Sequence, residues 1–376
     1  MSKKVETVAI VGGGNGAFIA AAHLALSGFK VNLFEAPELR KNIEGVMETK
    51  TITLTTKQNP GFEGGVARLN KVTVDPEEAV SDAQVVFVTV PAFGQKRMAE
   101  LLADYVKPDQ AVVLQPGNFG GSLEFAQVML ARGRTRLPIL MEFQCMIYTG
   151  WKDSPTTVWT SGYKHGNWVA AFPAKRNAEG LALVRQVYPD LVEAQNVFET
   201  GMSNVNTVFH APMLMCNAGW CETTGGNFML YWEGCSKSVG NVVTEVDNER
   251  MRVGAAAGMK LESCLEILRR WYGPQGAKGE TLQEIMSTNP AYQFDKCPPT
   301  LQHRFFLEDI PYGMIPLRDL GKVAGVPTPV TSAVITIVQT LLQRDLEKEA
   351  RSLDRLGLKG LDLKGIKKVL TEGFEA

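Results

Sequence analysis

The chain has 376 residues, of which 45% are apolar and 21% are charged. This composition is typical of a soluble globular protein and excludes a disordered or collagen-like chain. The 39 Lys and Arg residues balance the 40 Asp and Glu residues, so no net field attracts nucleic acid or an anionic membrane. We therefore expect no nucleic-acid partner, and the length favours two domains.

The six cysteines form neither a CxxC pair nor a Cys/His cluster, so no zinc or other metal site is expected. The start, Met1–Lys4, leads directly into a strand-like Val5–Val11 and lacks the apolar core of an export signal. The most apolar late stretch, 330–342, is too short and too polar to span a bilayer. These features predict a cytoplasmic protein with reduced thiols and no membrane contact.

The first third of the chain alternates strand-like and helix-like segments. Residues 7–11 form an apolar run rich in β-branched side chains, as expected of a strand buried on both faces of a parallel sheet. An Ala-rich helix is predicted over 18–27, and a second strand over 30–35. Further buried strands are predicted at 83–90, 111–115 and 138–143. This alternation is typical of a doubly wound Rossmann sheet, so the predicted fold class is α/β.

The pattern of the sequence changes near residue 194. Residues 151–172 still alternate and are expected to extend the sheet. Beyond them strand-like runs are few, and helices are predicted at 205–217, 237–258, 260–271, 281–287, 317–324 and 331–346. We therefore predict a nucleotide-binding Rossmann domain over 1–193, followed by a mostly α-helical domain over 194–376.

The turn after the first strand carries a dinucleotide fingerprint. Gly12, Gly14 and Ala17 fit the pattern G-x-G-x-x-G/A, with Asn15 and Gly16 between them. The first glycine permits a tight turn, the second lets a pyrophosphate approach the backbone, and the small third residue lets helix and strand pack closely. The helix N-terminus offers N–H groups and a positive dipole end to the phosphates. A turn that only makes a corner is the weaker interpretation, because the strand, helix and following acid are all in register.

That acid is Glu35, at the end of the second predicted strand and 23 residues after Gly12. A carboxylate there can accept hydrogen bonds from the adenosine ribose and would repel a 2′-phosphate. The sequence therefore favours NAD over NADP as the cofactor. NADP stays open, because Arg40 and Lys41 follow closely and could accommodate a phosphate if Glu35 turned away.

Two later strand ends should also face the cofactor, because ligands in such sheets bind outside the carboxyl ends of the strands. One is at Pro91, and the other is the loop 115–121 with Gly117 and Asn118. The loop could present backbone N–H groups to the nicotinamide. It could equally be an ordinary Gly-rich connection, and the residues alone leave both interpretations open.

The helical half contains the leading acid/base candidate. Residues 203–217 are predicted as a helix despite Pro212, and Asn206, His210 and Asn217 share one side of it. A polar stripe on an apolar helix is costly to bury unless it faces a partner or a cleft. His23, His165 and His303 lie in less suggestive settings. The alternative for His210 is a core or surface histidine that only packs.

A second group of polar residues follows at 302–313. Arg304 offers a planar fork that can bind a carboxylate, and Asp309 could orient a histidine and stabilise its protonated form. The alternative is a solvated charge cluster in which Arg304 pairs locally with Glu308 at i,i+4. Spacing alone slightly favours that alternative.

The sequence resembles the opine dehydrogenases, the octopine/nopaline dehydrogenase family. The resemblance runs in order along most of the chain and is not confined to the dinucleotide motif. The matching stretches are GGGNGA (12–17), QPGNFGGSLEF (115–125), NVNTVFHAPMLMCNAGWCE (204–222), YWEGCSKSVG (231–240), DNER (247–250), NPAY (289–292), HRFFLEDIPYGMIPLRDLGKVAGVPTPV (303–330) and RSLDRLGLKGL (351–361).

The resemblance implies a Rossmann domain followed by a helical domain of the 6-phosphogluconate dehydrogenase C-terminal type, with the active site between them. It implies reductive condensation of a 2-oxo acid, usually pyruvate, with the amine of an amino acid. In this family His210 and Asp309 would form the proton relay, and Arg304 would bind substrate carboxylate. Glu142 and Asn206 are assigned to substrate binding on the same ground. Relatives often have Thr-Pro-Ser-Val where this chain has Ser236–Val239, so Lys237 replaces the proline. This replacement either alters the amino-acid pocket or is only a change on the surface.

Two other functions remain to be separated from this one. A simple 2-oxo acid or 2-hydroxy acid reductase of the ketopantoate reductase type would oxidise NADH without an amine. Such enzymes use a lysine in the long helix, where this chain has Asn206 and His210. A nucleotide-binding sensor would lack one of His210, Arg304 or Asp309, and all three are present. The sequence names neither the amine nor the product stereochemistry, and a homodimer is the oligomer we would test first.

Overall fold

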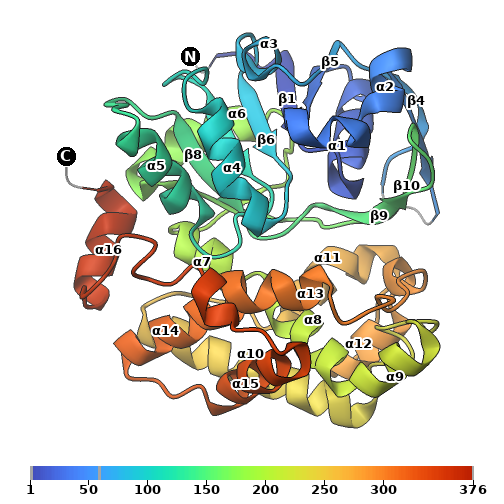
Figure 1. The fold of residues 1–376 in the computed structure, drawn as a ribbon, viewed down its shortest axis with the longest axis vertical. Coiled ribbons are helices and arrows are strands. Elements are labelled where there is room, and N and C mark those ends of the chain that lie inside the picture. Colours follow the sequence, from blue (N-terminus) through green and yellow to red (C-terminus); the bar gives the residue numbers. More distant parts are fainter. Residues whose placement is uncertain (1–2, 58–60, 375–376) are drawn as a thin grey trace. The chain divides into compact units, whose positions relative to one another are not determined.

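The computed structural model describes residues 3–57 and 61–374 (Figure 1). The chain divides into two compact units. The first holds Met1–Gly117, Gly121–Val197 and Leu370–Ala376, and the second holds Asn118–Gly120 and Phe198–Val369. The domain boundary predicted after residue 193 did not anticipate that residues 118–120 belong to the second unit and residues 370–376 to the first. These two exchanges arise because Phe374 packs on Phe172, with ring centroids 5.3 Å apart, and because Asn118 is hydrogen-bonded to Asn204.

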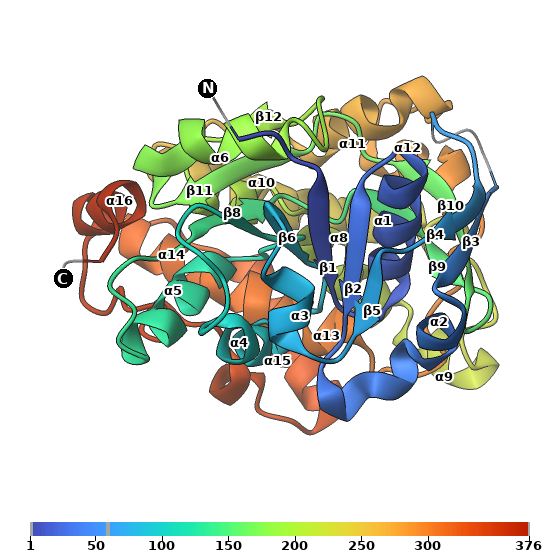
Figure 2. The same ribbon diagram turned by 90° about the horizontal axis from the view of Figure 1, so that it is seen from above.

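Eight strands form the central sheet of the first unit, in the order β12-β11-β8-β7-β6-β1-β2-β5 (Figure 2). Neighbouring strands are parallel except for β8 and β11. Their bounds are β1 (Thr7–Val11), β2 (Lys30–Phe34), β5 (Lys71–Thr73), β6 (Val85–Val88), β7 (Ala111–Leu114), β8 (Ile139–Phe143), β11 (Trp168–Phe172) and β12 (Val192–Glu193). Every residue of β1, β6, β7 and β8 is buried, as expected where helices cover both faces of a sheet.

Helices α1 and α6 lie on one face of this sheet, and α3, α4 and α5 lie on the other (Figure 2). The helices of the first unit are α1 (Asn15–Leu26), α2 (Glu44–Thr49), α3 (Pro76–Val80), α4 (Ala92–Leu102), α5 (Gly121–Ala131) and α6 (Asn177–Val184). The prediction of a doubly wound Rossmann sheet is therefore confirmed, with strand ends within about two residues of those expected from the apolar runs.

A second sheet, which the sequence did not predict, has the strand order β4-β3-β10-β9. It consists of β3 (Thr51–Thr56), β4 (Gly65–Arg68), β9 (Tyr148–Lys152) and β10 (Thr157–Tyr163). The expectation that 151–172 extends the central sheet is correct for β11 and wrong for the rest of that segment. The reason lies in α1, where Ala17–Ala22 and Leu24 are buried. A helix that is apolar all round needs cover on both sides, and the second sheet packs against it through β3, β4 and β9.

The second unit is built from helices packed around α8. The helices from residue 197 onward are α7 (Val197–Met202), α8 (Val205–Cys216), α9 (Ala218–Thr224), α10 (Lys237–Ala256), α11 (Cys264–Tyr272), α12 (Leu282–Thr288), α13 (Arg304–Leu307), α14 (Ile315–Ala324), α15 (Pro329–Leu342) and α16 (Leu363–Glu372). A π-helix, η5 (Ile310–Met314), precedes α14. Residues 207–214 of α8 are all buried, and α10, α13, α15 and η5 pack around it. The predicted mostly helical domain is confirmed.

A buried carboxylate on α10 holds the start of α15. The carboxylate of Glu249 accepts hydrogen bonds from the backbone N–H groups of Val330 and Thr331, at 2.7 and 2.8 Å. These donors belong to the first turn of α15, whose N–H groups have no partner within their own helix. The helix dipole also favours a negative charge there. Glu249 therefore joins α10 to the start of α15.

The six cysteines are free thiols, and all but Cys216 are buried. No helix in the described part of the chain is long and apolar enough to cross a membrane. Among the same residues, no group of three or more His, Cys, Asp or Glu side chains could hold a metal ion.

His23 of α1 lies in an aromatic cluster between the helix and the second sheet. Its ring stacks on Phe62, with centroids 4.0 Å apart, and its Nδ1 is hydrogen-bonded to the hydroxyl of Tyr148 at 2.8 Å. Burial lowers the pKa of His23 to about 4, because a charged imidazolium loses its hydration there. The folded protein therefore keeps His23 neutral at pH values where the unfolded chain protonates it.

The pH dependence of stability should reflect this histidine. Between about pH 6.5 and pH 4 the unfolded state binds a proton at His23 that the folded state does not, so the free energy of unfolding falls as the pH is lowered. His23→Phe should flatten that decline, as measured by urea unfolding at pH 7.5, 6 and 5. Tyr148→Phe is the control, since it removes the hydrogen bond but keeps the half-buried imidazole. A decline unchanged in His23→Phe would contradict the assignment.

Candidate active site

The glycine turn between β1 and α1 has the geometry of a phosphate site. Gly12 has φ of +124°, and a Cβ there would lie 3.0 Å from Thr89 Oγ1, so the position requires glycine. Gly14 is the N-cap of α1, and neither a capping side chain nor an acidic residue occupies the first turn. A Cβ on Gly14 would meet nothing within 4 Å. The N–H groups at this helix end are thus open to an anion, and the turn fits a dinucleotide pyrophosphate.

Glu35 lies beside this turn, as predicted. It is 2% exposed, and its carboxylate accepts hydrogen bonds from the backbone N–H of Ala36 at 2.8 Å and from Asn42 Nδ2 at 3.0 Å. A Cβ on Gly13 would lie 2.7 Å from Glu35 Oε2, which explains the extra glycine within the fingerprint. Arg40 and Lys41 are exposed on the 3-10 helix η1 (Pro37–Asn42). Asn15 uses its side-chain oxygen to accept a hydrogen bond from the backbone of Lys152, at 3.0 Å.

The other predicted strand ends lie at the same edge of the sheet, since they follow β6, β7 and β8. Pro91 is the N-cap of α4, and the Val90 side chain before it adjoins Gly12. Glu142 of β8 is completely buried and accepts a hydrogen bond from the backbone N–H of Ser122 at 2.7 Å. Its carboxylate also fills the space that a side chain at Gly117 would need. Glu142 thus supports the loop 115–121, and its predicted contact with substrate stays a prediction.

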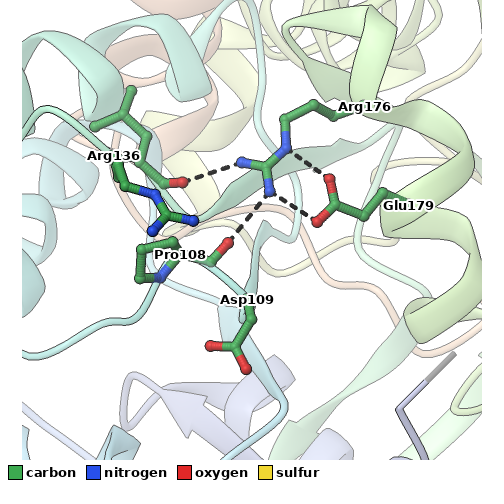
Figure 3. A pocket seen from close by; sticks show the side chains of 6 residues that line it. Pro108, Asp109, Arg136, Arg176 and Glu179 are labelled. Atoms are coloured by element: carbon green, nitrogen blue, oxygen red, sulfur yellow. Dashed lines mark hydrogen bonds and ion pairs between the residues drawn. The ribbon is translucent and has the colours of Figure 1, made fainter.

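A separate hollow lies at the opposite edge of this sheet. It has a volume of about 550 Å³ and is lined by Pro108, Asp109, Arg136, Leu137, Arg176 and Glu179 (Figure 3). Arg176 pairs with Glu179 and donates to the backbone carbonyls of Pro108 and Leu137. Its guanidinium therefore joins loops that precede β7 and β8, at the amino ends of those strands. Ligands of such sheets bind at the carboxyl ends, so we assign the hollow a structural role.

In the second unit, His210 and Asp309 are brought together although 99 residues separate them. His210 Nδ1 and Asp309 Oδ2 are 2.7 Å apart, and the two side chains are only 9% and 6% exposed. Asp309 directly precedes η5, which packs against α8. A carboxylate bonded to Nδ1 fixes the tautomer and leaves Nε2 as the reactive nitrogen. The predicted pair can therefore take up and release a proton at a defined atom.

Arg304 pairs with Glu308, as the alternative interpretation of this segment expected, but only the arginine is solvated and the carboxylate is buried. Arg304 Nε donates to Glu308 Oε2 at 2.7 Å, and the side chains are 46% and 2% exposed. The other oxygen of Glu308 accepts a hydrogen bond from Asn118 Nδ2 at 3.1 Å. Asn118 Oδ1 accepts one from Asn204 Nδ2 at 2.8 Å. Glu308 thus connects the predicted carboxylate-binding arginine to the predicted cofactor loop, a link that sequence reasoning missed.

Phe305 packs against the His210 ring and His303 packs against Phe305, two contacts that the sequence did not predict. Phe305 stacks on His210, with centroids 3.7 Å apart and planes at 18°, and His303 meets Phe305 edge-on at 4.6 Å. His303 caps α13, accepting a hydrogen bond at Nδ1 from the backbone N–H of Phe305. Burial and the nearby charges of His210 and Arg304 lower the pKa of His303 to about 4. His303 is therefore a neutral capping residue beside the pair.

Two members of the predicted polar stripe on α8 have different surroundings. Asn206 is half-buried, one turn before His210, and its backbone N–H donates to Asn204 Oδ1 at the helix start. Asn217 is the C-cap, and its amide donates to the carbonyls of Met213 and Gly234. Asn217 therefore ends the helix, while Asn206 remains beside the histidine.

Comparisons with known proteins agree with this geometry. Residues 193–342 match the family model described as "NAD/NADP octopine/nopaline dehydrogenase, alpha-helical domain". An opine dehydrogenase from Arthrobacter sp. (strain 1C) is 34% identical over 362 residues, which cover 96% of this chain and 98% of the relative. The chain belongs to the octopine/nopaline dehydrogenase family. It is accordingly an NAD(P)-dependent oxidoreductase that acts on CH–NH bonds, which confirms the prediction of an opine dehydrogenase.

Solved structures show the same fold. Octopine dehydrogenase with NADH and L-arginine has a TM-score of 0.77 at 20% identity, covering 98% of this chain and 99% of that one. Octopine dehydrogenase with NADH and pyruvate has a TM-score of 0.75 at 21% identity, with the same coverage of both chains. At these identities the likeness concerns the fold, and it confirms the α/β unit followed by a helical one.

The open space at Gly14 yields a test of the cofactor site. Gly14→Ala should fold with an unchanged melting temperature, because the added methyl meets no protein atom within 4 Å. It should weaken NADH binding at least tenfold, because that space is where the pyrophosphate would approach the backbone. Binding is measured by NADH fluorescence titration. Gly219→Ala is the control. A Cβ at Gly219 also meets no atom within 4 Å, but this residue lies on α9, outside the glycine turn. Equal NADH affinity in Gly14→Ala and wild type would contradict the assignment.

Proposed function

We propose that the protein catalyses the NADH-dependent reductive condensation of pyruvate with the amine of an amino acid, and the reverse oxidation. The buried His210–Asp309 hydrogen bond is the observation that carries the proposal. Condensation to an imine releases water, so a group must protonate the departing oxygen and exchange protons with nitrogen. Histidine is the side chain most often used for such proton exchange near neutral pH.

The proposal assigns the cofactor to the first unit. Gly12, Gly14, Gly16 and Ala17 would hold the pyrophosphate on the open end of α1, and Glu35 would face the adenosine ribose. Asn15, Pro91, Gly117 and Asn118 are the further residues assigned to cofactor binding. When bound, the dinucleotide supplies the hydride that reduces the imine carbon. Glu35 at the ribose favours NADH over NADPH, because its charge opposes a 2′-phosphate.

The proton transfer is assigned to His210. Asp309 holds Nδ1, so the protonated ring donates from Nε2 to the oxygen that leaves as water, and the carboxylate stabilises the positive charge. The stacked Phe305 keeps the imidazole plane fixed and excludes water from one face. Asn206, on the same side of α8, is assigned to holding the substrate beside the ring.

The carboxylate of the oxo acid is assigned to Arg304. Glu308 fixes the arginine through Nε, and the guanidinium is about half exposed. A guanidinium fixed at one edge can present its two terminal nitrogens to a carboxylate in a bidentate arrangement. Glu142 is assigned to the amino-acid substrate on the family resemblance. The cytoplasmic location and the homodimer stay predictions.

The function is tested by following NADH oxidation with pyruvate alone and then with amino acids added singly. The proposal predicts turnover only when pyruvate and an amine are both present, because the reducible species is the imine. The product mass should equal the sum of pyruvate and amine, less one water, plus two hydrogens. Oxidation by pyruvate without amine would instead indicate a simple 2-oxo acid reductase. NADH binding without turnover on any pair of substrates would contradict the enzymatic proposal.

A further inference from the structure

Lys152, the last residue of β9, lies directly against the glycine turn. Its backbone N–H donates to the side-chain oxygen of Asn15, in the first turn of α1, at 3.0 Å. Two residues earlier, Gly150 packs so closely on the helix that a Cβ there would lie 2.9 Å from Ile19. These backbone contacts of β9 fix the position of Lys152 beside the glycine fingerprint.

The ammonium of Lys152 joins the two parts of the predicted cofactor site. Nζ donates to the carbonyl of Gly13 at 3.2 Å and to the carbonyl of Asn42 at 2.9 Å. Gly13 lies between the first two fingerprint glycines, and Asn42 is the residue whose amide binds Glu35. The ammonium also lies over the Phe18 ring, 3.5 Å from its centroid. Three contacts from separate elements thus hold one positive charge at the turn.

This ammonium contacts neutral carbonyl groups and no carboxylate oxygen directly. No ion pair within 4.0 Å involves Lys152 among the described residues. Carbonyl oxygens are neutral, and two of them leave one of the three ammonium donors for another partner. Burial lowers the pKa of Lys152, while the more distant charge of Glu35 acts in the opposite direction. Holding a half-buried, unpaired ammonium is costly, and an anionic ligand at this point would offset that cost.

We propose that Lys152 binds a phosphate group of the dinucleotide and thereby contributes to cofactor affinity and selectivity. The inference rests on the assignment of the glycine turn to the cofactor made above. A dinucleotide offers two phosphate sources here, the pyrophosphate and the 2′-phosphate of NADPH. The ammonium could serve either one, because it contacts both the turn at Gly13 and the residue Asn42 of η1, the helix that also carries the exposed Arg40 and Lys41. The carboxylate of Glu35, held by Ala36 and Asn42, would repel the 2′-phosphate and would not affect the pyrophosphate in the same way.

Lys152→Gln is the informative variant, because its amide can still donate to the carbonyls of Gly13 and Asn42 but carries no charge. Equilibrium affinities for NADH and NADPH are measured by fluorescence, and those for ADP and 2′,5′-ADP by calorimetry, all with the full-length protein. Lys152→Arg keeps the charge and should retain most of the affinity. Lys57→Met is the matched control, since that ammonium lies over the Trp159 ring at 3.6 Å in the same sheet, away from the turn.

The inference predicts that Lys152→Gln weakens binding about 10- to 100-fold, the usual range for losing a hydrogen bond to a charged group. Equal losses for NADH, NADPH and ADP would identify the pyrophosphate as the partner. A loss confined to NADPH and 2′,5′-ADP would identify the 2′-phosphate. Affinities within twofold of wild type for all four ligands would overturn the inference, as would equal losses in Lys57→Met. A wild type that binds none of them would overturn the cofactor assignment itself.

Discussion

The hydrogen bond between His210 and Asp309 is the constraint around which the helical unit is organised. It joins the middle of α8 to the residue before η5, and both side chains are largely buried. An imidazole and a carboxylate buried this deeply require each other, because removing either would leave an unsatisfied polar group in an apolar interior. The surrounding helices α10, α13 and α15 supply that interior by enclosing α8. The packing that folds the unit therefore also places the acid/base pair.

The first unit meets a corresponding demand around α1. The side chains of α1 must be small and apolar so that the helix packs between two sheets, yet the N-terminus of the helix must stay open for a phosphate. Alanines satisfy the first requirement, and Gly14 satisfies the second by adding nothing to the space above the turn. The second sheet covers the outer side of the helix and also carries Lys152 to the turn. A structural cover for an apolar helix thus brings a positive charge to the cofactor site.

Local patterns in the sequence predict much of this arrangement. The strand, turn, helix and acid of residues 7–35 are contiguous, so spacing alone places Glu35 beside the turn. Asp309 and His210 could be named from residue type, but their pairing came from the family resemblance, because no local rule spans 99 residues. Glu308 was expected in a solvated pair, since spacing shows Arg304 four residues away and cannot show the burial beside Asn118. Lys152 carried no signal, because its partner Gly13 is 139 residues distant and its strand belongs to an unpredicted sheet.

Catalysis by this protein, as proposed, depends on His210 acting as the proton donor and acceptor. The most direct measurement is steady-state turnover of His210→Gln with NADH, pyruvate and an amine that the wild type accepts, together with the dissociation constant for NADH. If His210 transfers the proton, kcat falls roughly 10²- to 10⁴-fold, while NADH affinity stays within about twofold because the glycine turn is unchanged. Near-normal turnover in that variant would contradict this role and remove the His210–Asp309 pair from the reaction.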